Sequence, residues 1–171
     1  MASYDFVTVF ALRAPATAVF AAVVSPEAWL GADPHVRELQ RLAPGDAAGV
    51  GRCYRTTVAS SPYHLSWDME TVAVHEPRLV AWRADGDLEG NGRWELAGHD
   101  GVTEVVSTWQ VRTTRWWMNL LAPAARLLFV RNHDVAMRAA VDALAHHLDV
   151  EVVRFDRGGP LSGQTRDRRA P

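Results

Sequence analysis

The residue best suited to chemistry in this sequence is His133, which directly follows Asn132. A neutral imidazole titrates near neutrality and can both take up and release a proton, as an aldol cyclisation or a dehydration requires. The alternative is structural, because a buried imidazole usually hydrogen-bonds a carbonyl or a neighbouring strand. The sequence leaves both interpretations open.

Large aromatic residues form the second group of candidates, and they are Trp67, Trp82, Trp94 and Trp109. Indole rings gathered on one surface can hold a flat or lipid-like molecule, although each ring singly also fits ordinary core packing. Four such rings on one face are hard to pack without leaving space. The other ligand-binding candidates are Tyr63, whose hydroxyl would lie at the rim, and Met69, Phe129, Asn132, His133 and Met137.

A long helix over residues 116–149 must position His133. Its charged residues recur at steps of three and four, which places them on one exposed stripe: Arg131, Asp134, Arg138 and Asp142. The opposite, inward face carries Phe129, His133, Ala136, Met137, Ala140, Leu144 and His147. Residues 116–118 are predicted to open this helix and either gate a pocket or cap the core.

The tryptophans belong to a segment, Arg52 to Thr113, in which apolar and polar residues alternate. This period of two predicts strands at Arg52–Ser60, Tyr63–Val74, Leu79–Ala84, Leu88–Leu96 and Thr103–Thr113. The short turns between them make the strands antiparallel neighbours. Gly90 and Gly92 fall on the inner face, where we expect the sheet to curl or another group to approach closely.

The chain begins with a predicted strand at Tyr4–Leu12, a helix from Pro15 to the Ser25-Pro26 stop, and a short helical piece at Glu27–Leu30. The segment 31–51 should be mostly irregular, with a possible short helix over His35–Leu42. Residues 150–155 extend or fray after the long helix. We expect residues 1–155 to form one domain and residues 156–171 a disordered tail.

These elements predict an α+β fold. A sheet with one polar face needs a cover of similar length on its other face, and only the C-terminal helix is long enough. We therefore expect a curved antiparallel β-sheet wrapped around a long C-terminal α-helix, with two short helices after the first strand. An interior cavity between sheet and helix would bind a small molecule.

Composition argues against several other classes. The net charge is -2, the pI is near 6.4 and all 18 cationic residues are Arg, so we expect no nucleic-acid partner. No apolar run is long enough for a membrane span, and the first residues do not form a signal peptide, which favours a cytoplasmic protein, monomeric or homodimeric. No metal or cofactor is expected, because His146 and His147 diverge on a helix and no phosphate loop appears.

Several short segments resemble bacterial SRPBCC proteins of the START/Bet v 1-like superfamily, in particular the polyketide cyclase/dehydrase type. They are residues 26–29 (PEAW), 66–70 (SWDME), 79–82, 86–96 (GDLEGNGRWEL), 108–113 (TWQVRT), 117–123 (WMNLLAP) and 132–137 (NHDVAM). The resemblance covers most of residues 11–148 and implies the helix-grip fold. That fold hosts binding proteins, cyclases and hydrolases, so it does not by itself select an activity.

Two functions remain from the sequence. The first is binding of an apolar or aromatic compound, such as a lipid, polyketide or isoprenoid-like molecule, with His133, Asn132 and a tyrosine hydroxyl fixing its orientation. The second is a polyketide aromatase/cyclase in which the same cavity folds a poly-β-ketone and His133 moves protons.

Overall fold

The structure of the chain, a computed structural model, describes residues 3–60, 63–115 and 122–158. Within these residues, eight antiparallel strands form one sheet in the order β2-β3-β4-β5-β6-β7-β1-β8. The strands are β1 (Ser3–Leu12), β2 (Val36–Pro44), β3 (Arg52–Ser60), β4 (Tyr63–His75), β5 (Leu79–Gly86), β6 (Leu88–His99), β7 (Val102–Thr113) and β8 (Val152–Gly158). The helices are α1 (Ala16–Val23), the 3-10 helices η1 (Pro26–Ala28) and η2 (Leu30–Ala32), and α3 (Ala122–Leu148).

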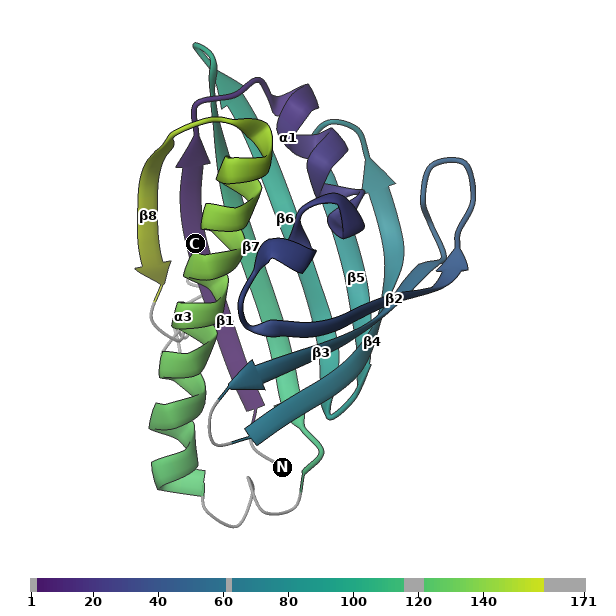
Figure 1. Ribbon diagram of the computed structural model, residues 1–171, viewed down its shortest axis with the longest axis vertical. Coiled ribbons are helices and arrows are strands. Elements are labelled where there is room, and N and C mark those ends of the chain that lie inside the picture. Colours follow the sequence, from purple (N-terminus) through teal and green to yellow (C-terminus); the bar gives the residue numbers. More distant parts are fainter. Residues whose placement is uncertain (1–2, 61–62, 116–121, 159–171) are drawn as a thin grey trace, which may run out of the picture.

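The predicted architecture is confirmed: a curved antiparallel sheet and a long C-terminal helix, with short helices after the first strand. Figure 1 shows α3 running along the sheet beside β1 and β8, while β2, β3 and β4 cross the other side of the molecule at a steep angle. The predicted helix start at residues 116–118 lies outside the described residues.

Two apolar clusters fix α3 on the sheet, one towards each end of the helix. Near its first turns, Phe129 packs with Phe6 and Trp109. Near its last turns, Val141 and Leu144 pack with residues of β1, α1 and β7, and all of these are fully or almost fully buried. Since both ends are anchored, the middle of α3 is held at a set distance from the sheet.

The phase of α3 agrees with the predicted faces except at its last turn. Phe129 and Leu144 are buried, and Arg131 and Arg138 are exposed. His147, expected on the inward face, is exposed instead. At 3.6 residues per turn the position that follows Leu144 on the same face is 148, and Leu148 packs against the core there.

The segment His35–Leu42 is not helical, contrary to the prediction, because His35 lies in a turn and the residues from Val36 onward belong to strand β2. Pairing with β3 shifts register twice, between Val36 and Glu38 and between Arg41 and Ala43. Each bulge adds one residue to the strand and breaks its period of two. The apolar residues Val36, Leu39 and Ala43 consequently fall at helix-like spacings in the sequence.

The predicted boundary between the domain and the C-terminal tail, at residue 156, lies too early in the sequence. Asp149 adopts a positive φ of 53° and ends the helix, after which Val152–Gly158 forms β8. This strand pairs antiparallel with β1, with Phe155 opposite Phe10. Residues 152–155, which we expected to extend or fray after the helix, are therefore part of a strand, and residues 156–158 also belong to the sheet. The remainder of the expected tail, residues 159–171, lies outside the described residues.

Gly92 in β6 is a position where two large rings approach the backbone closely. A Cβ atom there would lie 2.5 Å from Cε3 of Trp109 and 2.5 Å from both Cε2 and Nε1 of Trp82. Only glycine leaves room for both indoles on the inner face. The close approach expected at this glycine is confirmed, and it places two of the four predicted cavity tryptophans side by side.

Replacing Gly92 by Ala should therefore destabilise the fold by about 1–3 kcal/mol, because the methyl group displaces Trp82 and Trp109 from their positions. Urea denaturation measures the loss. Gly31→Ala is the matched control, since a Cβ at Gly31 meets no atom within 4 Å. Equal stability of the two variants would show that the indoles can move without cost.

Candidate functional site

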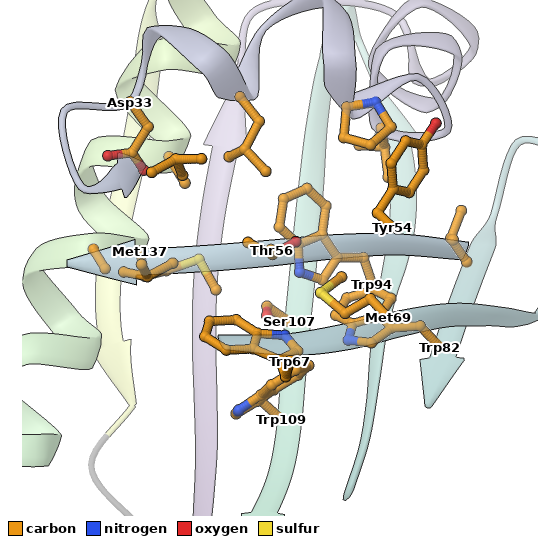
Figure 2. Close-up of a pocket in the computed structure, with 18 of the residues that line it drawn as sticks. Asp33, Tyr54, Thr56, Trp67, Met69, Trp82, Trp94, Ser107, Trp109 and Met137 are labelled. Atoms are coloured by element: carbon orange, nitrogen blue, oxygen red, sulfur yellow. The ribbon is translucent and has the colours of Figure 1, made fainter. Parts of the chain in front are cut away.

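A cavity of about 270 Å³ lies between the inner face of the sheet, the middle of α3 and the segment from η1 to β2. All ten residues proposed from the sequence as ligand-binding line it: Tyr63, Trp67, Met69, Trp82, Trp94, Trp109, Phe129, Asn132, His133 and Met137. Figure 2 shows Trp67, Trp82, Trp94, Trp109 and Met69 grouped together, with Met137 on the helix side. Four consecutive strands and the C-terminal helix thus meet at one site.

Four indoles form a continuous wall of this cavity. They come from the neighbouring strands β4, β5, β6 and β7, each from an inward-facing position. The ring centroid of Trp82 lies 5.9 Å from that of Trp109 and 6.2 Å from that of Trp94. Trp67 lies 6.4 Å from Trp109. These tilted and edge-on contacts are typical of favourable aromatic packing, and they present ring faces and edges to the cavity.

The helix side of the cavity carries Phe129, His133 and Met137, one helical turn apart from each other. The His133 imidazole stacks on Phe6, with centroids 3.8 Å apart and planes 8° from parallel. Asn132 donates a hydrogen bond from Nδ2 to the Tyr63 hydroxyl at 3.1 Å, which joins α3 to β4. Burial raises the pKa of Tyr63, although the bond from Asn132 acts against the shift.

The imidazole of His133 is held by stacking and not by a hydrogen bond at Nδ1. This atom is buried and has no hydrogen-bond partner among the described residues. The carboxylate Oδ1 of Asp134 lies 3.7 Å away, beyond hydrogen-bond distance. The purely structural interpretation, in which His133 hydrogen-bonds a carbonyl, is therefore not observed at Nδ1, and this atom is enclosed by protein.

Two further side chains that line the cavity also have a buried nitrogen without a hydrogen-bond partner among the described residues, Nε1 of Trp67 and Nε1 of Trp82. A buried polar group without a partner costs about 1–3 kcal/mol, because it has lost water and gained nothing in exchange. Such groups are infrequent in folded proteins. All three belong to residues that line the cavity, although the nitrogens themselves are enclosed by protein atoms.

The sequence analysis missed Asp33 and Arg52, two charged residues that line the cavity together with Tyr54. Asp33 is buried, and its Oδ1 accepts a hydrogen bond of 2.8 Å from the backbone N–H of His35. Burial raises the pKa of Asp33 and outweighs that bond. Figure 2 shows Asp33 and Tyr54 beyond the tryptophans. The Asp33 side chain supplies hydrogen-bond acceptors to this part of the cavity lining.

Tyr54 is linked to Glu27 by a hydrogen bond of 2.6 Å from its hydroxyl to Oε2, and Arg41 lies 3.3 Å from Oε1 of the same carboxylate. Burial and this bond raise the pKa of Tyr54 to about 12. Burial acts to raise the pKa of Glu27, but the Tyr54 hydroxyl and the charges of Arg41 and Arg52 outweigh it and lower the pKa. The pair ties η1 to β3 at the rim.

Trp29 is a further lining residue that the sequence did not identify as part of the site. It is buried, its Nε1 donates to the Ala22 carbonyl at 2.8 Å, and its ring lies 6.5 Å from that of Trp94. Trp29 stands between two 3-10 turns, where no period of two or 3.6 marks an inward side. Its only signal was its place in the PEAW segment of the family resemblance.

No family model matches the chain, and no curated protein matches its sequence significantly. Solved structures do match. The Zhui aromatase/cyclase from Streptomyces sp. R1128 is 17% identical, with a TM-score of 0.71 over 86% of this chain and 94% of that one. TTHA0849 from Thermus thermophilus is 18% identical, with a TM-score of 0.70 and 84% and 96% covered. Ara h 8.0201 is 13% identical, with a TM-score of 0.62 and 86% and 98% covered.

The chain therefore has the Bet v 1-like helix-grip fold that polyketide aromatase/cyclases share, as the sequence resemblance predicts. In the part of the chain that the structure describes, no helix is long and apolar enough to cross a membrane. No three His, Cys, Asp or Glu side chains of residues 3–60, 63–115 and 122–158 are grouped so as to hold a metal ion.

Replacing Tyr54 by Phe should lower the free energy of unfolding by about 1 kcal/mol, less than a fully buried bond to a charged group would give, because Glu27 is partly exposed. The difference between the two proteins should be constant from about pH 6 to pH 9. It should shrink as the pH rises through ~10 towards 12. In this range Tyr54 ionises in the unfolded chain before it ionises in the folded protein, because its pKa is raised by folding to about 12, and the stabilising contribution of its hydroxyl is lost.

At low pH the contribution of the bond depends on pH in the opposite direction. Since the pKa of Glu27 is lowered, its contribution is present above the ordinary carboxyl pKa and is lost as the pH falls. Chemical denaturation of both proteins across this pH range measures the difference. A difference that stays unchanged in strong alkali would mean that the hydroxyl does not bond Glu27.

Proposed function

We propose that this protein binds an apolar or aromatic small molecule, of lipid, polyketide or isoprenoid-like type, in the cavity between its sheet and α3. The observation that carries the proposal is the composition of the cavity wall: four indoles, Phe129, Met69 and Met137 around about 270 Å³ of space. A mostly apolar wall with a few convergent polar groups is typical of small-molecule sites.

The physical driving force is removal of apolar ligand surface from water. At ~25 cal/mol per Å², burying about 200 Å² of ligand surface contributes ~5 kcal/mol before the entropy cost of association. The polar groups then fix orientation. Asn132 and Tyr63 lie at one end, near His133, and Asp33 and Tyr54 lie at the other. A ligand with an apolar middle and polar substituents would satisfy both regions.

Filling the cavity should abolish binding. Ala136 lines it from α3, so Ala136→Phe should weaken binding of the neutral fluorescent probe N-phenyl-1-naphthylamine at least tenfold. The matched control is Val135→Phe, because Val135 is exposed on the next position of the same helix and its variant should bind as the wild type does. Titration by probe fluorescence gives both affinities.

The natural ligand can be sought in parallel. Protein purified without detergent should carry an apolar compound that solvent extraction and mass spectrometry detect, and Ala136→Phe should carry less of it. Equal affinity of Ala136→Phe and the wild type for the probe would place the binding elsewhere and contradict the proposal.

A second function, that of a polyketide aromatase/cyclase, is supported by the position of His133 in the lining of the cavity and by the fold shared with an aromatase/cyclase. His133 would take a proton from a methylene group between two ketones of a bound poly-β-ketone. The resulting carbanion would attack a ketone carbon of the same chain, and the alkoxide so formed would take the proton back from the imidazolium. Loss of water would follow, and the cavity would exclude competing solvent.

Replacing His133 by Ala should then abolish turnover of a suitable polyketone, a loss of about 10²–10⁴-fold, and leave affinity largely intact. His133→Phe is the companion variant, since it keeps a ring to stack on Phe6 while removing the proton-transfer group. Steady-state kinetics measure turnover, and calorimetric titration measures affinity. Turnover by His133→Phe equal to that of the wild type would remove His133 from the mechanism.

A further inference from the structure

Asp33 is the one carboxylate among the described residues that line the cavity. It is buried, and Oδ1 of its side chain accepts the backbone N–H of His35 at 2.8 Å. The other oxygen, Oδ2, has no hydrogen-bond partner in the described part of the chain. Unlike the nitrogens of Trp67, Trp82 and His133, Oδ2 is not enclosed by protein atoms, so a molecule in the cavity can reach it.

The turn at Asp33 does not by itself require a buried carboxylate. Asp46 makes a similar turn, in which its Oδ1 accepts the N–H groups of Ala48 and Val50 at 2.9 Å each, and Asp46 is exposed to solvent. A carboxylate in an apolar site loses hydration, and burial accordingly raises the pKa of Asp33. The turn therefore accounts for the bond at Oδ1, but it does not account for the burial of Oδ2.

The other polar side chains of the cavity lining do not distinguish a hydrogen-bond donor from an acceptor in the same way. Arg52 and Asn132 donate to other parts of the protein. The hydroxyl groups of Thr56 and Ser107, which also line the cavity, can either donate or accept. An ionised carboxylate only accepts. Asp33 is therefore the lining residue best placed to select a ligand by the presence of a donor.

We infer that Oδ2 of Asp33 binds a hydroxyl group of the ligand, so that the cavity selects phenols and other hydroxylated aromatic compounds over the corresponding ethers and hydrocarbons. This inference rests on the proposed binding function and narrows it. Water can serve Oδ2 when no ligand is bound. A ligand hydroxyl replaces the hydrogen bond of that water, whereas an ether or a hydrocarbon displaces the water and leaves the carboxylate without a partner.

A neutral donor fits this place better than a cation does. An ammonium group would lose its hydration on entering a cavity lined by indoles and methionines, and a carboxylate repays that loss only with excellent geometry. A hydroxyl loses less, and its bond to a carboxylate is charge-assisted. In the view of Figure 2, Met137 and Trp67 lie on the same side of the cavity as Asp33, so a ring system that carries the hydroxyl can pack against them.

The test compares 2-naphthol with 2-methoxynaphthalene, which share one ring system, although only the first has an O–H to donate. Calorimetric titration of the wild type at about pH 7 should give about tenfold tighter binding of 2-naphthol. Asp33→Asn keeps an acceptor for the N–H of His35 and puts an amide donor in place of Oδ2, so the ratio should fall to about one. Asp46→Asn is the matched control, since Asp46 does not line the cavity, and the ratio should persist.

A second measurement uses the wild type alone. In ¹³C spectra of labelled protein, the side-chain carboxyl signal of Asp33 should move further on addition of 2-naphthol than on addition of 2-methoxynaphthalene. Equal wild-type affinity for the two compounds, or a ratio that survives in Asp33→Asn, would overturn the Asp33 site and leave the binding function standing. Failure of both compounds to bind would overturn the binding function and the Asp33 site together.

Discussion

The structure depends on the fit of two indoles over a glycine. Trp82 and Trp109 occupy the space that a side chain at Gly92 would take, which lets large rings lie low on the inner face of the sheet. Because α3 is anchored by apolar clusters at its two ends, its middle does not descend to close the remaining distance. The cavity results from bulky rings below, a fixed helix above and small residues such as Ala136 and Ala140 facing them.

Some polar groups of the residues that line this cavity are hydrogen-bonded and others are not. Asn132 and Tyr63 satisfy each other, as do Tyr54 and Glu27, and these pairs join separate elements of the fold. The nitrogens of Trp67, Trp82 and His133 are left without partners in the described part of the chain. These three nitrogens are enclosed by protein atoms, so the side chains present their other atoms to the cavity.

Much of this could be predicted from the sequence because the signals were periodic. Alternation placed Trp67, Trp82, Trp94 and Trp109 on one face, and the charged stripe of α3 oriented His133 and Met137 correctly. The predictions failed where a period was interrupted. The two bulges of β2 gave its apolar residues a helix-like spacing. The end of α3 before β8 is marked only by the positive φ of Asp149. Trp29 and Asp33 lie in turns, where no periodic pattern indicates which side chains face inward. The missing hydrogen bonds of the cavity were unpredictable because they depend on distances between strands.

The irregular pairing of β2 also bears on how the molecule avoids association. Within the described sheet, β2 is one of the two edges, and its outward backbone groups have no neighbouring strand. Its two bulges twist that border, and Arg37, Glu38 and Arg41 place charges along it. A strand from a second molecule would meet a discontinuous ladder and would have to bury ions to join it, so growth of the sheet from this side is disfavoured.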